Sequence, residues 1–289
     1  MSVEERDPHS GHMMTGHEWN GIKELNRPVP KPVWVFIVVT VTFAVIMWLL
    51  MPAWPLITTY TKGLLHTDQR VRLEKQMLTA NAQRAGWVKK IEESPMAAIM
   101  ADPALMKIVR ETGPSLFQDN CAACHGLNAK GGPGYPNLTD NTWLWGGDPD
   151  TVLETINVGI NSTNQGTRSS QMQAWGRDGL LNRQQLLDVV AYVRSLSGLA
   201  SSTGNVGEGK AVFTANCVAC HGADGRGLDQ FGAPDLTDNF WIYGGDEQSV
   251  YETVYGGRQG VMPHWNARLS EVQRKILAAY VVDLGKAAP

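Results

Sequence analysis

The feature that most limits what this chain can fold into is a repeat in its C-terminal part. Each copy contains a Cys-x-x-Cys-His string, Cys121–His125 in the first and Cys217–His221 in the second. These strings contain all 4 cysteines of the 289-residue chain, so none remains for a disulfide framework. Both copies continue with a Pro-x-Leu-Thr-Asp-Asn segment and end in an apolar periodic stretch. The repeat therefore predicts two similar structural units.

The spacing within each string indicates covalent attachment of haem. Two thiols three positions apart can add to the two vinyl groups as thioethers, and the following histidine then points its imidazole at the iron. A zinc site is disfavoured because no second pair of Cys or His residues follows either string. The predicted attachment residues are Cys121, Cys124, Cys217 and Cys220, and the predicted iron ligands are His125 and His221.

The second axial ligand of each iron is predicted from the remaining methionines. After His125 the chain contains only Met172, in the first copy, and Met262, in the second. One methionine per copy in the same register favours His/Met ligation, which raises the reduction potential and closes the iron to small ligands. His264 is the alternative ligand, but it has no counterpart in the first copy. The sequence leaves open which methionine serves which haem.

The histidines and the haems also need supporting groups. The second ring nitrogen of a haem-binding histidine is usually held by a carbonyl oxygen. Pro136 and Pro234, which follow the two histidines by 11 and 13 residues, are the best candidates for that carbonyl. Arg168 and Arg258 are candidates to pair with haem propionates, with solvated surface positions as the alternative.

The N-terminal part contains one stretch suited to a membrane. Residues Val33–Met51 carry no charge, and at 1.5 Å per residue they span about 28 Å, close to a hydrocarbon core of about 30 Å. Trp34, Trp48 and Trp54 mark the ends as interfacial aromatic residues do. A buried core helix is disfavoured by the absence of charge. A cleaved signal peptide is disfavoured because 32 residues precede the stretch.

The other segments predict helices and loops. Residues 1–32 are polar and predict a flexible or loosely docked tail, and residues 66–93 predict an exposed helix. Asp102 followed by Pro103 is typical of a helix start. Residues 183–196 and 271–284 show helical spacing of apolar residues, and predict the last helix of each copy. The glycine-rich loops before these helices show no strand alternation.

The chain as a whole resembles a known family. The resemblance rests on residues 16–28, on Pro52–Pro55 after the apolar stretch, on Thr61–Gly63, and on the two haem repeats that follow. Together they are similar to the dihaem cytochrome c subunit III of cbb(3)-type cytochrome c oxidases. One departure is Gln173, which stands where the family pattern has a proline after the ligand methionine.

The resemblance implies an all-α fold, with one N-terminal transmembrane helix followed by two tandem class I cytochrome c domains. It also implies a bacterial inner-membrane protein with a cytoplasmic N-terminus and periplasmic haems. The implied segments are a cytoplasmic tail at 1–32, an anchor at 33–55, a helical linker at 56–107, cytochrome c domain 1 at 108–198 and cytochrome c domain 2 at 204–289.

The function implied by the resemblance is electron transfer through two haem c groups. The donor would be a soluble or membrane cytochrome c, and the acceptors the mono-haem and haem–copper subunits of the oxidase. The chain has no copper ligands, so we expect it not to be the catalytic subunit. A stand-alone membrane cytochrome and a dihaem peroxidase-like enzyme are the alternatives. The expected partners include membrane lipid but no nucleic acid, since the net charge is −3.

Overall fold

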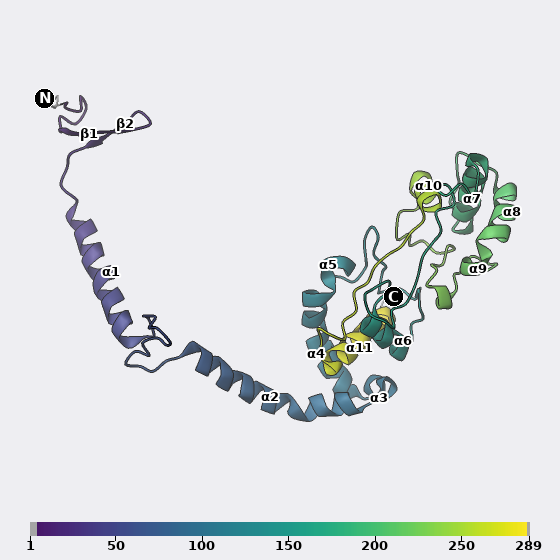
Figure 1. The fold of residues 1–289 in the computed structure, drawn as a ribbon, viewed down its shortest axis with the longest axis horizontal. Helices are drawn as coiled ribbons and strands as arrows, with labels where there is room; N and C mark the ends of the chain where they lie inside the picture. The colour runs from purple at the N-terminus through teal and green to yellow at the C-terminus, as the bar shows by residue number, and fades with distance from the viewer. Residues whose placement is uncertain (1–4, 288–289) are drawn as a thin grey trace. The chain divides into compact units, whose positions relative to one another are not determined.

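The computed structural model in Figure 1 describes residues 5–287. The chain divides into two compact units, residues 1–83 and 84–289. Among the described residues, helices predominate, and two short strands lie near the N-terminus.

The N-terminal tail contains a β-hairpin that we did not predict. Strand β1 (Met14–Trp19) pairs antiparallel with β2 (Ile22–Leu25). Asn20 and Gly21 form the turn, and both have positive φ angles (49° and 83°), as a two-residue Asn-Gly hairpin requires. The fold is therefore helix-rich rather than strictly all-α. The strands escape sequence analysis because they are largely exposed and bury no apolar face.

Helix α1 (Lys31–Leu50) coincides with the uncharged stretch predicted to cross a membrane. It starts among prolines, with Pro32 in its first turn, where the missing N–H is not needed. Its mean hydropathy is 2.7 over an 18-residue window, and none of that window is buried. Thr40 and Thr42 donate their hydroxyl hydrogens to the carbonyls of Phe36 and Val38 at 2.9 and 2.7 Å, so their polar groups are satisfied within the helix.

The chain folds back against the end of α1. The backbone N–H groups of Leu64 and Leu65 donate to the carbonyls of Leu49 and Leu50 at 2.9 and 3.0 Å, satisfying acceptors that a helix end otherwise leaves unpaired. Gly63 permits this approach, because it has a φ of 65° and a Cβ there would lie 2.4 Å from the Leu50 carbonyl oxygen.

The remaining helices vary in length, and α2 is the longest of them with 25 residues. They are α2 (Gln69–Glu93), α3 (Met96–Ala101), α4 (Pro103–Asn120), α5 (Ala122–His125), α6 (Pro149–Val158), α7 (Arg183–Leu196), α8 (Val206–Asn216), α9 (Val218–His221), the 3-10 turn η1 (Asp229–Phe231), α10 (Glu247–Gly256) and α11 (Glu271–Ala287). An Asn or Asp side chain caps the start of α4, α6, α7, α8 and α10 by accepting from backbone N–H groups. The predicted cap at Asp102 is among them.

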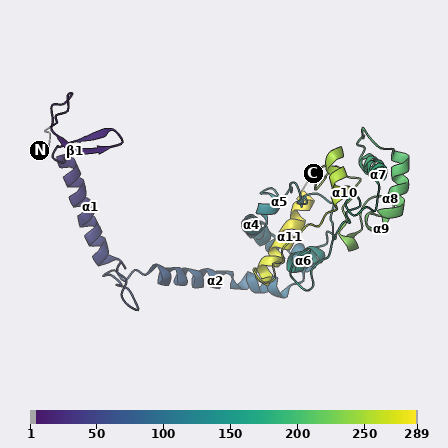
Figure 2. The same ribbon diagram turned by 45° about the horizontal axis from the view of Figure 1, so that its top comes forward.

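The helices of the second unit pack as two modules that combine both sequence repeats. In the first module α11, from the second repeat, packs on α4 and α6 from the first. In the second module α7, from the first repeat, packs on α8 and α10 from the second. Figures 1 and 2 show both groupings from two directions. Each module has its own cluster of buried apolar side chains.

The exchange of helices follows from the short connection between the repeats. Only residues 197–205 separate α7 from α8, and elements joined by so short a segment usually become neighbours in space. Once α7 packs on α8, the face of Leu186, Val189 and Val190 is buried in the second module. The first module is then completed by α11.

Each module is closed by a helix crossing at a glycine. A Cβ on Gly113 of α4 would lie 2.6 Å from the ring of Tyr280 of α11. A Cβ on Gly209 of α8 would lie 1.9 Å from the Asp188 carbonyl oxygen of α7 and 2.8 Å from Tyr192. The two tyrosines occupy equivalent positions in the repeats. Hence the same tight crossing is built twice, each time with a partner helix from the other repeat.

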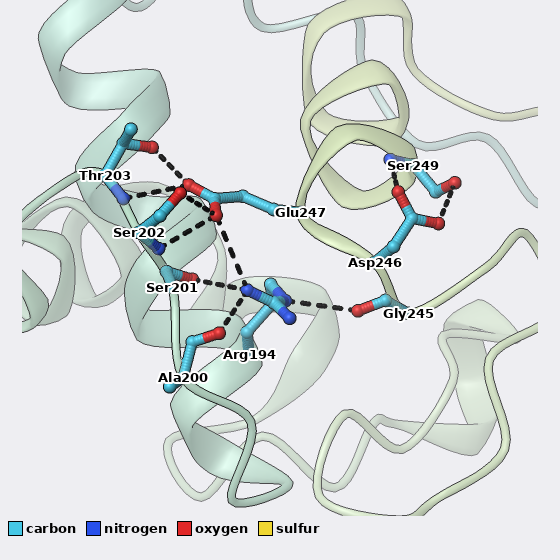
Figure 3. A network of polar contacts seen from close by, with 9 residues as sticks. All are labelled: Arg194, Ala200, Ser201, Ser202, Thr203, Gly245, Asp246, Glu247 and Ser249. Carbon is cyan, nitrogen blue, oxygen red and sulfur yellow. Dashed lines mark hydrogen bonds and ion pairs between the residues drawn. The ribbon is translucent and has the colours of Figure 1, made fainter.

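A polar network holds the connection between the repeats (Figure 3). The Glu247 carboxylate, at the start of α10, accepts hydrogen bonds from the backbone and hydroxyl groups of Ser202 and Thr203. Arg194 of α7 donates to the Gly245 carbonyl at 3.1 Å and to the Ser201 hydroxyl at 2.9 Å. The donors from Thr203 and Ser202 lower the pKa of Glu247 to about 2. The connection is thereby fixed to both α7 and α10.

A buried lysine joins the end of α2 to α11. Lys275 is 9% exposed, and its Nζ donates to the carbonyl oxygens of Glu92 at 2.6 Å and Ser94 at 3.1 Å. It also pairs with Glu271 at 2.9 Å. A cation is favourable at the C-terminal end of a helix, where carbonyl groups lack partners. The C-terminal end of α2 and the whole of α3 therefore belong to the first module, and Ile91 and Ile99 are fully buried in its cluster.

Replacing Gly209 by alanine should destabilise the second module. The added Cβ would meet backbone atoms of Asp188, which cannot rotate away, so we expect a loss of about 1–3 kcal/mol. Thermal unfolding of the detergent-solubilised chain measures the effect. Gly86→Ala is the control, because nothing lies within 4 Å of its Cβ position in α2. Equal thermal midpoints for the two variants would contradict the tight crossing.

Replacing Glu247 by glutamine should loosen the connection between the repeats at neutral pH. An amide oxygen cannot replace both carboxylate oxygens as acceptors, so the backbone amides of Ser202 and Thr203 should exchange hydrogen faster. Because the folded-state pKa is lowered from 4.5 to about 2, the stabilisation is present above about pH 4.5 and is lost as the pH falls towards 2. The thermal midpoints of variant and parent should converge over that range.

The matched control is Glu252→Gln, on the same helix α10. The Glu252 carboxylate accepts from the Gln248 side chain at 2.9 Å and makes no hydrogen bond to the connection. Its replacement should leave exchange at Ser202 and Thr203 unchanged. Unchanged exchange in Glu247→Gln itself would show that the network does not hold the connection.

Candidate haem sites

Each Cys-x-x-Cys-His string forms one helical turn at the end of a longer helix. The Cys121 N–H donates to the Phe117 carbonyl at 2.7 Å, which closes α4, and the His125 N–H donates to the Cys121 carbonyl at 3.0 Å, which closes α5. Cys217 and His221 repeat this geometry at the end of α8, with distances of 2.8 and 3.0 Å. The turn brings two thiols and one imidazole close together, as attachment to one haem requires.

Both histidines of the strings are oriented by a proline carbonyl. The Nδ1 atom of His125 lies 3.2 Å from the Pro136 oxygen, and that of His221 lies 3.3 Å from the Pro234 oxygen. These are the two carbonyls that the sequence analysis selected. A hydrogen on Nδ1 leaves Nε2 as the nitrogen free to bind a metal. Burial lowers the pKa of both imidazoles, which favours the neutral form that binds iron.

The loops after the histidines close back on them. Gly131 donates its N–H to the His125 carbonyl at 2.9 Å, and Gly227 donates to the His221 carbonyl at 2.8 Å. Both glycines have positive φ, and a Cβ on Gly131 would lie 2.4 Å from a carbonyl oxygen of the same loop. The loops can therefore bring Pro136 and Pro234 beside the imidazoles only because glycine occupies these positions.

One cysteine of each string lies against the apolar cluster and the other faces outward. Burial, with a smaller effect of the neighbouring cysteine, raises the pKa of Cys121 and of Cys217 to about 11. Cys124 and Cys220 are exposed. Burial thus favours the neutral form of the inner thiols. Neutral thiols at the edge of an apolar cluster fit a site for a porphyrin joined through thioethers.

Met262, from the second repeat, lies in the first module, and Met172, from the first repeat, lies in the second module. Met262 packs against the cluster that also contacts Cys121, and Met172 packs against the cluster that contacts Cys217. Backbone hydrogen bonds fix both loops: Met262 exchanges two with Ile160, each 2.9 Å long, and Met172 exchanges two with Arg258, 2.8 and 3.2 Å long. The structure therefore brings each Cys-x-x-Cys-His turn together with the methionine of the other repeat.

His264, the alternative ligand considered from the sequence, is engaged elsewhere. Its Nδ1 lies 2.8 Å from the side-chain oxygen of Asn266, and its Nε2 lies 3.3 Å from the hydroxyl of Thr163. Both ring nitrogens thus have polar partners outside the apolar cluster. This arrangement favours Met262 over His264 as the residue facing the first site.

The two arginines have equivalent positions in the two modules. Arg168 donates to the Thr155 hydroxyl at 3.0 Å and lies over the Trp145 ring at 5.0 Å. Arg258 donates to the Thr253 hydroxyl at 3.0 Å and lies over the ring of the equivalent aromatic residue, Tyr243, at 4.3 Å. These aromatic partners were not predicted, although the repeated Trp-x-[Trp/Tyr]-Gly-Gly-Asp segment was a signal for them.

Taken together, each site contains the groups that a haem c needs. Two thiols and an imidazole project from one turn, a carbonyl oxygen orients the imidazole, and a methionine borders the same apolar cluster. The donor set of nitrogen and thioether sulfur suits a low-spin haem iron. The residues present therefore fit this cofactor in both modules.

Three regions of the chain match models of known protein families. The family described as "N-terminal domain of cytochrome oxidase-cbb3, FixP" matches residues 11–58. The family "Cytochrome c" matches residues 110–197, and "Cytochrome C oxidase, cbb3-type, subunit III" matches residues 204–281. Two cytochrome c regions imply haem c binding.

Full-length relatives carry the same names. The chain is 42% identical to the "Cbb3-type cytochrome c oxidase subunit FixP" of Bradyrhizobium diazoefficiens, over 97% of each chain. It is also 42% identical to the subunit CcoP of Azospirillum sp., over 99% of each chain, and to that of Cereibacter sphaeroides, over 94% of each chain. The apolar helix α1 lies within the matched N-terminal family region, which supports membrane anchoring. The chain belongs to the FixP/CcoP family of cbb3-type cytochrome c oxidase subunits.

Proposed function

We propose that this protein is the membrane-anchored dihaem electron-transfer subunit of a cbb3-type oxidase. The observation that carries the proposal is the pairing of each Cys-x-x-Cys-His turn with one methionine around a separate apolar cluster. Its electrons would come from a soluble or membrane cytochrome c. The acceptors would be the mono-haem cytochrome c subunit and the haem–copper subunit, where oxygen is reduced. The chain itself would be non-catalytic.

The proposal assigns a defined role to each group in the two sites. Cys121 and Cys124 hold the first haem and Cys217 and Cys220 hold the second. His125 and His221 bind iron through Nε2, and their Nδ1 atoms stay fixed by Pro136 and Pro234. Each bound haem c supplies a one-electron iron couple.

The methionines are proposed to be exchanged between the two sites. Met262 completes the site of His125, and Met172 completes the site of His221, because each borders the corresponding cluster. A thioether is a soft, weak donor that favours ferrous iron and keeps small ligands away. Closed irons suit a carrier and do not suit a peroxidase, which needs an open coordination position.

The proposed topology places the N-terminal tail in the cytoplasm and both haem modules in the periplasm of a bacterial inner membrane. Haem c is attached outside the cytoplasm, which supports this orientation. Lys23, Arg27 and Lys31 precede the uncharged stretch Val33–Met51, whereas Lys62 and Arg70 follow it. That difference is small but has the sign expected for a cytoplasmic N-terminus.

Replacing either methionine by alanine should open one iron. Each variant should lose about half of the sulfur-to-iron charge-transfer band of the oxidised protein and should bind carbon monoxide when reduced. Intact mass should stay two haems above the polypeptide, because the thioethers are untouched. If either variant kept the whole band, that methionine would not be a ligand.

Single-haem chains can test the exchange itself. With Cys217 and Cys220 replaced by serine, only the first site should retain a covalent haem. Its charge-transfer band should then disappear on adding Met262→Ala and survive Met172→Ala. The reverse result would show that each methionine serves the haem of its own repeat.

Association with an oxidase should require the N-terminal unit. We expect the tagged full-length chain to co-purify with a haem–copper subunit and a mono-haem cytochrome c. A shortened chain beginning at Arg84 should be soluble, keep both haems and fail to co-purify. The cut lies before Ile91 because that residue is buried in the first module. Purification of the full-length chain without any oxidase subunit would favour the stand-alone cytochrome.

A further inference from the structure

The two repeats differ at one place beside the methionine loops. In the second repeat Gly257 is followed directly by Arg258 and then by the Met262 loop. In the first repeat the corresponding Gly159 and Arg168 are separated by an additional loop, residues 160–167. This loop has no counterpart in the second repeat, so it breaks the approximate symmetry of the two modules.

The side chain of Asn161 in this additional loop reaches both methionine loops. Its Nδ2 atom donates to the Ser170 carbonyl at 2.7 Å and to the Gly260 carbonyl at 2.7 Å. Its Oδ1 atom accepts from the Ser170 N–H at 3.1 Å. Ser170 and Gly260 each stand two residues before a methionine, Met172 and Met262. One carboxamide thus binds equivalent points of the two loops.

Few residues other than asparagine could make this set of contacts. Asn161 has a φ of 47°, in the left-handed region, where asparagine is tolerated better than most residues. Both amide hydrogens and one oxygen of its side chain are used at once. Aspartate would keep the acceptor but would place a carboxylate against two carbonyl oxygens. Glycine would keep the backbone but lose all three bonds.

The backbone of the additional loop strengthens the same connection. Ile160 pairs with Met262 through the two backbone bonds described above, and the Asn161 N–H donates to the Arg168 carbonyl at 2.7 Å. The loop is therefore joined to the Met262 segment and to the segment that leads into Met172. Displacement of either segment has to break bonds of Asn161.

We propose that Asn161 is a positioning residue that couples the two methionine loops by holding both at once, so that its loss weakens both axial thioethers. The inference rests on the proposed role of Met172 and Met262 as iron ligands. Asn161 makes two hydrogen bonds to the Met172 loop and one to the Met262 loop. At about 1 kcal/mol per bond, their loss converts into a rise in the open form of about 30-fold at the Met172 loop and about 5-fold at the Met262 loop.

The test uses the full-length chain with both haems attached, and observes one methionine at a time. In a Met262→His background, the remaining sulfur-to-iron band reports only Met172. In a Met172→His background, it reports only Met262. Adding Asn161→Gly should lower the temperature at which the band is lost in both backgrounds. It should also raise carbon monoxide binding by about 30-fold at the iron that Met172 ligates and by about 5-fold at the iron that Met262 ligates.

Two further variants separate positioning from simple misfolding. Asn161→Asp keeps the side-chain size and the Ser170 N–H bond but removes both donors, and should lower the same temperatures while Ser170 keeps its amide protection. Asn164→Asp is the matched control, because the Asn164 carboxamide accepts from Gly166 within the same loop at 2.8 Å. That control should change neither band.

The outcomes distinguish this inference from the one on which it rests. An effect of Asn161→Gly in one background alone, or in neither, would overturn the coupling while leaving the ligand assignment intact. Full charge-transfer bands in the single Met172→Ala and Met262→Ala variants would instead overturn the ligand assignment. Equal effects of Asn161→Asp and Asn164→Asp would show a general response of the loop rather than a role of Asn161.

Discussion

The packing of α7 on α8, which the short connection at residues 197–205 favours, determines the arrangement of the C-terminal unit. At Gly209 the backbones of α8 and α7 approach so closely that a Cβ would meet the Asp188 carbonyl, and at Gly113 the Tyr280 side chain of α11 packs directly on the backbone of α4. Because α7 packs on α8, the segment with Met172, which precedes α7, lies in the second module. The segment with Met262, which precedes α11, then packs against the cluster that contacts Cys121. Helix packing thus determines which side chains can face each haem site.

Local sequence signals predict much of this organisation. The uncharged stretch corresponds to α1, Asp102 caps α4, and the last helix of the first repeat occupies Arg183–Leu196 as its spacing predicted. The Pro136 and Pro234 carbonyls lie beside the histidines, because the short distance along the chain leaves the loop few alternatives. Signals of this kind involve residues that are neighbours in sequence.

The features that escaped prediction depend on contacts between distant segments. The repeat divides the sequence near residues 198–204, but the packed modules combine helices from both sides of that division. Local periodicity cannot reveal this, because Leu186 and Val189 would form the same apolar face against either partner. The contact of Asn161 with both methionine loops could not be predicted either, since its partner Gly260 belongs to the other repeat. The hairpin at Met14–Leu25 was missed because its exposed strands lack an apolar face.

The exchange of α7 and α11 also affects the order in which the two sites can form during synthesis. During synthesis the first string emerges with Cys121 and His125, whereas the segment with Met262 and α11 emerges after the other helices of both modules. With the proposed exchange of methionines, the earlier site therefore waits for this segment, whereas the later one can close as soon as α10 is complete. A chain that stops shortly before Met262 would complete the site around His221, which begins later in the sequence. It would leave the site around His125 open to solvent.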